Sequence, residues 1–473
     1  MDKQFDVLVI GGGPGGTPAA MALAQAGKKT LLVEAGAGLG GTCLFEGCVP
    51  SKIFRETAER MRDIARAEEF GIRVPHEMVK LNWPQVQTRK RAILKRRSEE
   101  AILKAGHLNN LHILLGHAQL SGPRTAFIKP TKGDGNTIEI KFEQCILATG
   151  STPNPLPIQG ADSSQVYNSD SILNIDFIPE QLVVIGGGPI GVELAQIFHA
   201  LGAHVTLMEM EPHILSIVDA ELALALEQRL IEQGISLQVN CKIKSIHQSD
   251  NGVFVDYDTK LGSDSIYATA ILAATGRSPR IDSLGLEFTS VKSGPRGVEV
   301  DETLQTAEPG IYAVGDIVGQ PMFAHWATAQ GLAVARHLIG MPVKFPKPEH
   351  NSATIFSDPE LCMAGLTEAQ ASNVGMEAGV AHYDFSQDAR AQISGHDNGL
   401  LKIVYDKKSR RVVGVHILVD GAADLMGEAA LMVSIGLTLE SIAEAIHPHP
   451  TLTESFGFAA RAALMAEMAK RPS

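Results

Sequence analysis

The chain has 473 residues, 44% of them hydrophobic, and a formal net charge of −12 at pH 7. This length predicts several domains with real hydrophobic cores. The acidic balance argues against nucleic acid or an anionic membrane as the main partner. No apolar run approaches the roughly 20 residues of a membrane helix, and we expect no cleavable leader, because the first residues lead straight into a strand-like segment. The cysteines number only five, which is unlike a secreted disulfide scaffold, so we expect a cytoplasmic protein.

Residues 5–34 carry the pattern of a strand, a glycine-rich turn, a helix to about Gly27 and a second strand that ends in Glu34. The turn matches G-x-G-x-x-G through Gly11, Gly13, Pro14, Gly15 and Gly16. Such glycines allow a pyrophosphate to approach the backbone at a helix N-terminus, and the acidic residue accepts hydrogen bonds from a ribose. The segment therefore predicts a dinucleotide site.

Cys43 and Cys48 lie five positions apart, which in an undistorted helix separates them by roughly 7.5 Å along the axis. A disulfide requires Cα atoms about 4.4–6.8 Å apart, so the segment must bend if the two are to bond. Gly47 permits a bend, and Pro50 suits the first turn of a following helix, with Ser51 near its start, whose N-terminus would favour a Cys48 thiolate. Two alternative interpretations remain at this point: the cysteines are two inert buried thiols, or they are half of a zinc site. No other Cys or His lies near in sequence, and we predict no metal.

Long helices are predicted over 53–69 and 82–105. The second contains the basic run 89–97, which would suit a nucleic-acid patch, but its interleaved apolar and acidic residues favour a solvated helix face. Short strands over 111–146, with turns at 121–123 and 132–135, lead into a glycine turn at 149–150. The Pro-rich segment 153–157 then predicts a crossing between domains.

The first pattern repeats from residue 182. A second G-x-G-x-x-G follows a strand and contains Gly186, Gly188, Ile190 and Gly191. The distance from Gly11 to Glu34 (34 − 11 = 23) equals that from Gly186 to Glu209 (209 − 186 = 23). This equality predicts two dinucleotide sites in one chain. The unit closes at Gly276 with a strand-into-glycine turn that echoes 146–150.

Glu209 indicates which nicotinamide cofactor binds at the second site. A carboxylate at the ribose accepts from a 2′-hydroxyl and repels a 2′-phosphate. Residues 210–216 contain no Arg or Lys that would neutralise such a phosphate. The sequence therefore favours NAD over NADP.

Residues 306–316 predict a turn and a hydrophobic strand that ends in Gly-Asp, at the sheet edge where ligands bind. An ordinary buried strand is the alternative. A helix follows from about 321 to 339. Past Pro342–Pro348 the composition predicts a mixed α/β tail, with strands near 353–356, 400–405 and 411–418 and helices near 367–372 and 421–435. We predict that Cys145, Cys241 and Cys362 are packing residues.

Together these features resemble the flavoprotein disulfide reductases over nearly the full chain. The motif Gly-Gly-Thr-Cys-x4-Cys-x-Pro-Ser-Lys at 40–52, the 306–316 pattern, and the tail segments 421–430 and 447–454 carry the resemblance, which is strongest to the dihydrolipoamide dehydrogenase branch. It implies an α/β fold with two Rossmann-like dinucleotide-binding domains and a C-terminal α+β dimerisation domain. The boundaries we predict are 1–150 and 280–346 for the two FAD-binding parts, 151–279 for the NAD-binding domain and 347–473 for the interface domain.

The resemblance also implies the residues that bind the cofactors FAD and NAD. For FAD these are Gly11, Gly13, Pro14, Gly15, Gly16, Glu34, Gly41, Thr42, Lys52, Ala118, Thr149, Gly150, Asp316, Met322, Ala324 and His325. For NAD they are Gly186, Gly188, Ile190, Gly191, Glu193, Glu209 and Gly276.

The catalytic residues it implies are Cys43, which exchanges with the substrate, and Cys48, which contacts the flavin. Lys52 and Glu193 match an ion pair beside the flavin. A dithiol attacks a disulfide as a thiolate, so a base is needed, and His449 fits that role with Glu454 fixing its tautomer. The His449–Pro450 bond is a candidate cis peptide.

The resemblance further implies a homodimer whose active site is shared between subunits, and a lipoyl domain of a 2-oxo-acid dehydrogenase complex as partner. Phe45, Glu46, Trp326 and Gln330 depart from the usual residues and put the substrate in doubt. Another NADH-dependent disulfide reductase is therefore an alternative, and a structural flavoprotein without turnover is the non-enzyme alternative. The paired cysteines argue against a soluble transhydrogenase. The lack of a C-terminal cysteine pair argues against mercuric reductase, and the lack of arginines after Met208 argues against a glutathione-type reductase.

Overall fold

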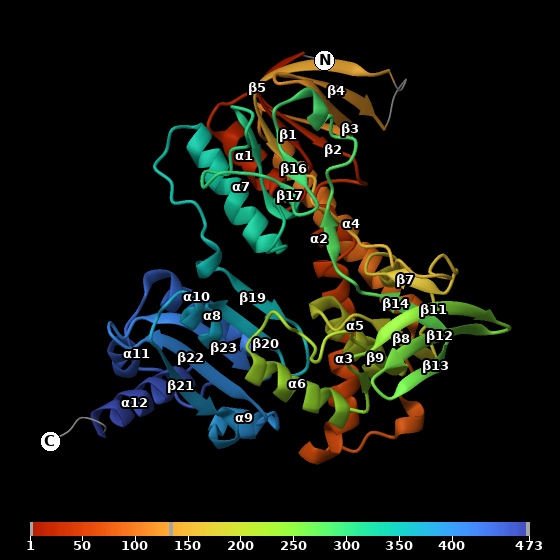
Figure 1. Ribbon diagram of the computed structural model, residues 1–473, viewed down its shortest axis with the longest axis vertical. Coiled ribbons are helices and arrows are strands. Elements are labelled where there is room, and N and C mark those ends of the chain that lie inside the picture. Colours follow the sequence, from red (N-terminus) through yellow and green to blue (C-terminus); the bar gives the residue numbers. More distant parts are fainter. Residues whose placement is uncertain (1–2, 132–135, 470–473) are drawn as a thin grey trace. The chain divides into compact units, whose positions relative to one another are not determined.

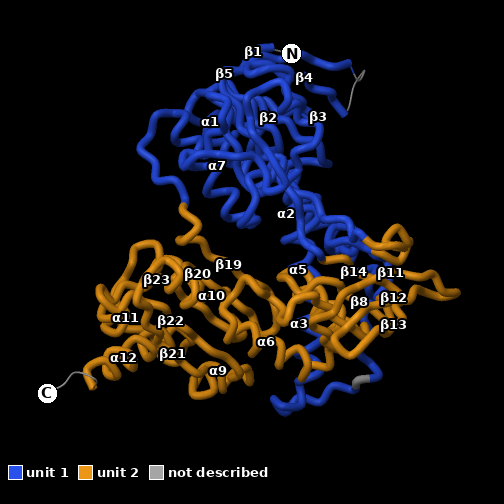
Figure 2. The backbone as a smooth tube through the Cα atoms, viewed as in Figure 1, with its two compact units in different colours: residues 1–157, 167–178, 275–346 blue, residues 158–166, 179–274, 347–473 orange. Residues whose placement is uncertain are grey.

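The computed structural model describes residues 3–131 and 136–469, so the turn expected at 132–135 lies outside the described residues. The chain forms two compact units (Figure 2): unit 1 comprises residues 1–157, 167–178 and 275–346, and unit 2 comprises 158–166, 179–274 and 347–473. Unit 1 first ends at Pro157, where the Pro-rich crossing was expected. This division is coarser than the four predicted domains, whose boundaries stay predictions.

Unit 1 is built on a parallel sheet (Figure 1) in which β1 lies between β2 and β5, β2 pairs with β3, and β5 pairs with β18. Continuous apolar runs such as Val7–Ile10 account for this parallel sheet, because a strand in such a sheet is buried on both faces. Helices α1 and α7 pack together against it, and long β3 and β5 continue into an antiparallel meander through β4. The elements of this unit are β1 (Gln4–Ile10), α1 (Gly16–Gln25), β2 (Thr30–Glu34), α2 (Gly41–Phe45), α3 (Cys48–Arg66), α4 (Trp83–Gly106), β3 (Leu111–Gly122), β4 (Thr125–Pro130), β5 (Ile138–Leu147), β6 (Ser151–Pro153), β15 (Arg277–Pro279), β16 (Ser293–Gly294), β17 (Gly297–Val298), β18 (Ile311–Ala313) and α7 (Ala324–Leu338).

Unit 2 contains two sub-folds. The first is a parallel sheet in the order β10-β9-β8-β14 with a separate antiparallel sheet β11-β12-β13, and it repeats the strand–glycine turn–helix of unit 1. Its elements are β8 (Gln181–Ile185), α5 (Pro189–Ala200), β9 (His204–Met208), α6 (Ala220–Glu232), β10 (Ser236–Gln238), β11 (Lys242–Ser249), β12 (Gly252–Thr259), β13 (Gly262–Ala268) and β14 (Ala270–Ala273). The short strand β7 (Val166–Asn168) lies where the chain passes between the units.

The second sub-fold is an antiparallel sheet in the order β19-β20-β23-β22-β21, against which α10 and α12 pack. Its core includes Phe385, Ile403, Ile417 and Phe456, all fully buried. Its elements are β19 (Ser352–Ile355), β20 (Leu361–Gly365), α8 (Glu368–Asn373), β21 (Ala378–Asp384), α9 (Ala389–Ser394), β22 (Leu400–Asp406), β23 (Val412–Leu418), α10 (Ala422–Ile435), α11 (Leu439–Glu444) and α12 (Glu454–Ala469). The predicted α/β fold class with an α+β tail is confirmed.

Two local expectations need correction. The helix after the cysteines begins at Cys48, and the short helix α2, which was not predicted, precedes it. The basic helix α4 is also not simply a solvated face. Its Lys90 is only 3% exposed and donates from Nζ to the carbonyl oxygen of Leu173 at 2.5 Å. Burial lowers the pKa of Lys90 to about 8. The packing of Cys145, Cys241 and Cys362 inside the fold is as expected, since all three are buried.

Candidate active site

The first glycine loop joins β1 to α1 through backbone contacts that only glycine allows. Gly11 has a φ of +109°, and a Cβ placed there would lie 2.2 Å from the carbonyl oxygen of Ala148. A Cβ on Gly16 would lie 1.9 Å from the carbonyl oxygen of Gly11. The Glu34 carboxylate, at the end of β2, accepts from the backbone N–H of Gly12 at 2.5 Å. This is the tight strand–helix junction that a pyrophosphate site requires.

A second segment closes over this loop. A Cβ on Gly41, the first residue of α2, would lie 2.7 Å from the Cα of Gly13, whereas a Cβ on Gly13 would meet nothing nearer than 3.8 Å. The two backbones therefore approach as closely as glycines permit, while Gly13 keeps room on its own Cβ side. The first turn of α1 has no side chain that caps its N–H groups. These backbone donors fit the pyrophosphate of FAD.

The second glycine loop reproduces the first in unit 2. Gly186 has a φ of +110°, and a Cβ on Gly191 would lie 1.9 Å from the carbonyl oxygen of Gly186. The Glu209 carboxylate accepts from the N–H of Gly187 at 2.6 Å and from that of Glu211 at 2.8 Å. This repeats the arrangement of Glu34 and fits the adenosine end of NAD.

Asp316 lies in a network of polar contacts within unit 1. Its Oδ2 accepts from Ser151 Oγ at 2.6 Å. Arg277 donates from Nε to Ser151 Oγ at 2.9 Å and from Nη1 to Asp170 Oδ1 at 2.7 Å. Gln330 on α7 accepts from the N–H of Gly315 at 2.8 Å, which fixes the turn in front of Asp316. The network holds this carboxylate in one orientation.

The other residues predicted at the FAD site lie in three places of unit 1. Ala118 is buried on β3 opposite Ile128. Thr149 and Gly150 follow β5, and Thr149 Oγ1 donates to the carbonyl oxygen of Arg280 at 2.6 Å. The remaining predicted residues lie at the starts of helices: Thr42 in α2, and Met322, Ala324 and His325 at α7. Their contacts with FAD stay predictions.

The cysteine segment bends as the spacing required. Helix α2 carries Cys43 and ends at Phe45, and α3 begins at Cys48 after Gly47, which has a φ of −152° and a ψ of −104°. Both cysteines are thiols in this structure, Cys43 half-buried and Cys48 exposed, and their side chains are hydrogen-bonded to each other. That hydrogen bond and burial raise the pKa of the Cys43 thiol well above its ordinary value, while the charges of Lys52 and Arg97 act in the opposite direction. Cys43 therefore keeps its proton at neutral pH unless a base removes it.

His449 and Glu454, the predicted base and its acidic partner, form a hydrogen-bonded pair before and at the start of α12. His449 Nδ1 lies 3.1 Å from each carboxylate oxygen of Glu454. Glu454 Oε2 also accepts from the N–H of Thr451 at 3.0 Å, and this hydrogen bond, followed by the contact with His449, lowers the pKa of the Glu454 carboxyl. The His449 side chain is 72% exposed. The expected cis bond between His449 and Pro450 is confirmed.

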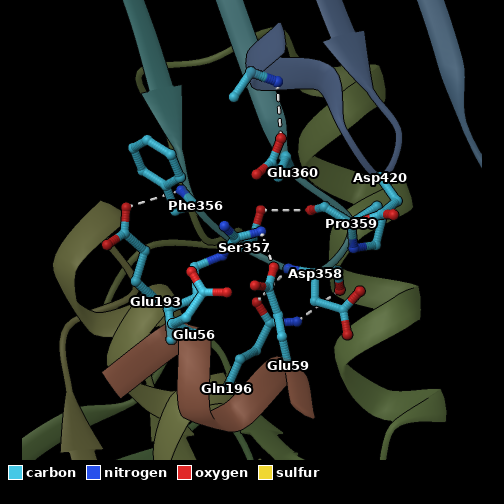
Figure 3. A network of polar contacts seen from close by, with 12 residues as sticks. Glu56, Glu59, Glu193, Gln196, Phe356, Ser357, Asp358, Pro359, Glu360 and Asp420 are labelled. Atoms are coloured by element: carbon cyan, nitrogen blue, oxygen red, sulfur yellow. Dashed lines mark hydrogen bonds and ion pairs between the residues drawn. The ribbon is translucent and has the colours of Figure 1, made fainter. Parts of the chain in front are cut away.

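Glu193 lies on α5, in a polar network of unit 2 (Figure 3). Its carboxylate accepts from the backbone N–H of Phe356 at 2.9 Å. One turn further along α5, Gln196 accepts from the N–H of Asp358 at 2.9 Å. The network therefore fixes Glu193 between two sub-folds of the same unit. Lys52 belongs to unit 1, so its pairing with Glu193 stays a prediction.

The structure brings together the members of each local set: the two cysteines, the His–Glu pair, and each glycine loop with its glutamate. The sets themselves are divided between the units, and Gly276 lies in unit 1 while Gly186 lies in unit 2. Within the described part of the chain, no group of three or more His, Cys, Asp or Glu residues is arranged to hold a metal ion. No described helix is long and apolar enough to cross a membrane.

Sequence reasoning did not find Ser151, Arg277 or the role of Gln330. A signal was present for the first two. Two turns have the same first three residues: Ala148-Thr149-Gly150-Ser151 and Ala274-Thr275-Gly276-Arg277. Their fourth residues, Ser151 and Arg277, are hydrogen-bonded to each other. The strands β6 and β15, which begin at these two residues, pair in antiparallel fashion.

Two family models cover most of the chain. The model of pyridine nucleotide-disulphide oxidoreductases matches residues 5–331, and that of the dimerisation domain of the same family matches residues 351–460. The chain therefore belongs to the pyridine nucleotide-disulphide oxidoreductases.

Similar proteins within this family are dihydrolipoyl dehydrogenases. That of Geobacillus stearothermophilus is 36% identical, covering 98% of this chain and 96% of its own length. The mitochondrial enzyme of Sus scrofa is 34% identical over 95% of this chain and 89% of its own. Among solved structures, LpdA of Mycobacterium tuberculosis has a TM-score of 0.88 at 27% identity, covering 97% of this chain and 99% of that one. The HOCl-induced flavoprotein disulfide reductase RclA of Escherichia coli, solved as a Cu(II) complex, has a TM-score of 0.86 at 25% identity, covering 98% and 100%.

These findings confirm that the chain is an FAD- and NAD-dependent disulfide oxidoreductase. The roles of Cys43 and Cys48 stay predictions. The match to the dimerisation domain of the family supports a homodimer. The disulfide that it acts on is a separate question.

Proposed function

We propose that this enzyme oxidises a dihydrolipoamide-type dithiol to the disulfide and reduces NAD⁺ to NADH. The observation that carries the proposal is the His449–Glu454 pair in a chain that also carries two closely spaced cysteines, Cys43 and Cys48. Glu454 occupies Nδ1 of His449, which leaves Nε2 as the ring nitrogen without a hydrogen-bond partner among the described residues. A neutral imidazole in that tautomer accepts a proton at Nε2.

The exchange of thiols follows from this chemistry. A substrate thiolate attacks Sγ of Cys43 in the Cys43–Cys48 disulfide, and Cys48 leaves as a thiolate. His449 removes the proton of the second substrate thiol, which attacks the mixed disulfide and releases the cyclic product. Cys43 takes up a proton from His449, and two electrons have then passed from the substrate to the cysteine pair. The raised pKa of the Cys43 thiol makes a base necessary for the reverse direction as well.

The cofactors take up the remaining chemistry. Bound FAD supplies the two-electron relay between the cysteine pair and NAD⁺. The chain contributes the loop at Gly11–Gly16 with Glu34, Gly41 and Asp316 to hold FAD, and the loop at Gly186–Gly191 with Glu209 to hold NAD. Cys48, at the N-terminal end of α3, is placed where a helix favours a thiolate.

The assembly is part of the same proposal. His449 of one subunit acts on the cysteines of the other, which accounts for its exposure in the single chain. The dithiol is carried by a lipoyl domain of a 2-oxo-acid dehydrogenase complex in the cytoplasm. The dihydrolipoyl dehydrogenases that match this chain over at least 95% of its length support this assignment.

A different disulfide is the second candidate. Phe45 and Glu46, which depart from the usual residues, lie between the two cysteines in the sequence, and Trp326, at 6% exposure, is packed into the fold near the start of α7. The likeness to RclA, a disulfide reductase, supports the same alternative.

Anaerobic reduction by dihydrolipoamide tests the proposal. We expect a long-wavelength charge-transfer band between the flavin and the Cys48 thiolate, its loss in Cys48→Ser, and turnover with NAD⁺ but little with NADP⁺. If NADH bleaches the flavin while dihydrolipoamide has no effect, the redox relay stands and the second candidate replaces the first.

A further inference from the structure

A second His–Glu pair lies two residues before the proposed base. His447 Nε2 is 2.9 Å from Glu428 Oε1, and the His447 side chain is only 11% exposed, against 72% for His449. Glu428 lies on α10 and His447 on the loop 445–453 between α11 and α12. The buried pair therefore ties the loop that carries His449 to a neighbouring helix.

The other side of the His447 ring faces the first turn of α12. A Cβ on Gly457 would lie 3.4 Å from His447 Nδ1, so any larger residue there would crowd the ring. Gly457 is three residues after Glu454, which places both on one face of the helix. Arg461, a turn further on, donates to the carbonyl oxygen of Ala443 at 2.8 Å and anchors the end of α11.

We propose that His447 and Glu428 are positioning residues for the dithiol reaction: they hold the loop 445–453 on α10 and α12 and thereby keep His449 in place against Glu454. This inference rests on the proposed function of His449. The charge of His447 contributes to lowering the pKa of the Glu454 carboxyl, after the Thr451 N–H and His449. The charged and titratable groups around this cluster are Glu428 from α10, Arg461 from α12, His449 from the loop and Tyr383 from β21.

The expected effect on the reaction follows from the position of the base. Loosening of the loop lowers kcat by about tenfold, because small misplacements of a base are costly.

The test uses the holoenzyme with His447→Gln, Glu428→Gln and the double variant. His382→Gln is the matched control, since His382 also contacts a glutamate, Glu221 at 3.3 Å, but at a site 49% exposed. The rate of dithiol oxidation is measured against pH with dihydrolipoamide and with dithiothreitol. The NADH-dependent reduction of ferricyanide, which takes electrons from the flavin without the cysteine–histidine step, is measured in parallel.

We expect the two single variants to lower dithiol oxidation about tenfold, and the double variant to add little, because both residues act through one contact. Ferricyanide reduction and His382→Gln stay at the wild-type level. Unchanged dithiol oxidation, additive losses, or an equal loss in the ferricyanide reaction would overturn the inference. If the wild type oxidises dithiothreitol and not dihydrolipoamide, the substrate assignment fails, and the dithiothreitol profile still decides the role of His447.

Discussion

The two glycine loops of this chain have the same backbone geometry and different surroundings. A Cβ on Gly16 and a Cβ on Gly191 would each lie 1.9 Å from a carbonyl oxygen, that of Gly11 and that of Gly186 respectively. The first loop is backed by Gly41, while a Cβ on Gly188 in the second loop would meet no described heavy atom within 4 Å. The Asp316 network is likewise found beside the first loop alone. The first loop is therefore backed by a second backbone segment and the second loop is not, and we propose that this difference suits a resident FAD at the first and an exchanging NAD at the second.

The largest effect is expected when the glycine at each strand–helix junction is replaced by alanine. In both Gly16→Ala and Gly191→Ala the new Cβ would lie 1.9 Å from a backbone oxygen, so the strain is matched at about 1–3 kcal/mol or more. We expect Gly16→Ala to lose FAD and with it nearly all activity. Gly191→Ala should stay yellow and raise the KM for NAD⁺ about tenfold or more. Flavin absorbance after gel filtration and steady-state kinetics measure the two effects. If both variants retain FAD, the close approach of Gly41 to the first loop does not make FAD binding more sensitive to strain at that loop.

The two glutamates give the next largest effect. Glu209→Ala removes two hydrogen bonds to the loop and the repulsion of a 2′-phosphate. We expect the KM for NAD⁺ to rise about tenfold, since a hydrogen bond to a charged group contributes about 1.5–3 kcal/mol, and the preference over NADP⁺ to shrink. Glu34→Ala should leave the KM for NAD⁺ unchanged and weaken the binding of FAD. A change in NAD⁺ kinetics from Glu34→Ala would break the assignment of the two loops.

A smaller effect is expected from the Asp316 network, which distinguishes the first site. Arg277→Gln removes the donor that links Ser151 to Asp170, and Ser151→Ala removes the hydrogen bond to Asp316. Each substitution should weaken the binding of FAD about five- to tenfold, because the oriented carboxylate loses about one hydrogen bond. Arg229→Gln, in an exposed ion pair on α6, is the control and should have no effect. The dissociation constant of FAD from the apoenzyme measures the change, and equal values for all three variants would exclude the network from flavin binding.

Much of this could be predicted from the sequence because it rests on local patterns. The glycine loops, Glu34 and Glu209 follow from spacing along one strand–turn–helix unit, and the bend at Gly47 follows from the cysteine spacing. The contact between Ser151 and Arg277 joins positions 126 residues apart, and that between Gln330 and Gly315 depends on how α7 packs, so no local pattern contains them. Lys90 looked solvated for the same reason, since its partners near residue 173 are distant in sequence.

The smallest expected difference concerns the threonines at the two strand-into-glycine turns. Thr149 Oγ1 donates to the carbonyl oxygen of Arg280 at 2.6 Å, whereas the buried Oγ1 of Thr275 has no hydrogen-bond partner in the described chain. Valine has the same shape, so Thr149→Val loses a hydrogen bond and should destabilise the enzyme by about 1 kcal/mol. Thr275→Val removes an unsatisfied hydroxyl and should be neutral or stabilising by a similar amount. For a domain of about 150–250 residues, this corresponds to a Tm shift of about 2–4 °C.

Thermal unfolding followed by circular dichroism, with FAD saturating and NAD absent, measures both variants under the same conditions. The difference between them matters more than either value. If Thr275→Val is as destabilised as Thr149→Val, the hydroxyl of Thr275 has a partner in solution and the two turns are equivalent. If Thr275→Val is stable but has a higher KM for NAD⁺, the hydroxyl finds its partner in the nucleotide, and the contrast between a permanently filled and an intermittently filled site extends to these threonines.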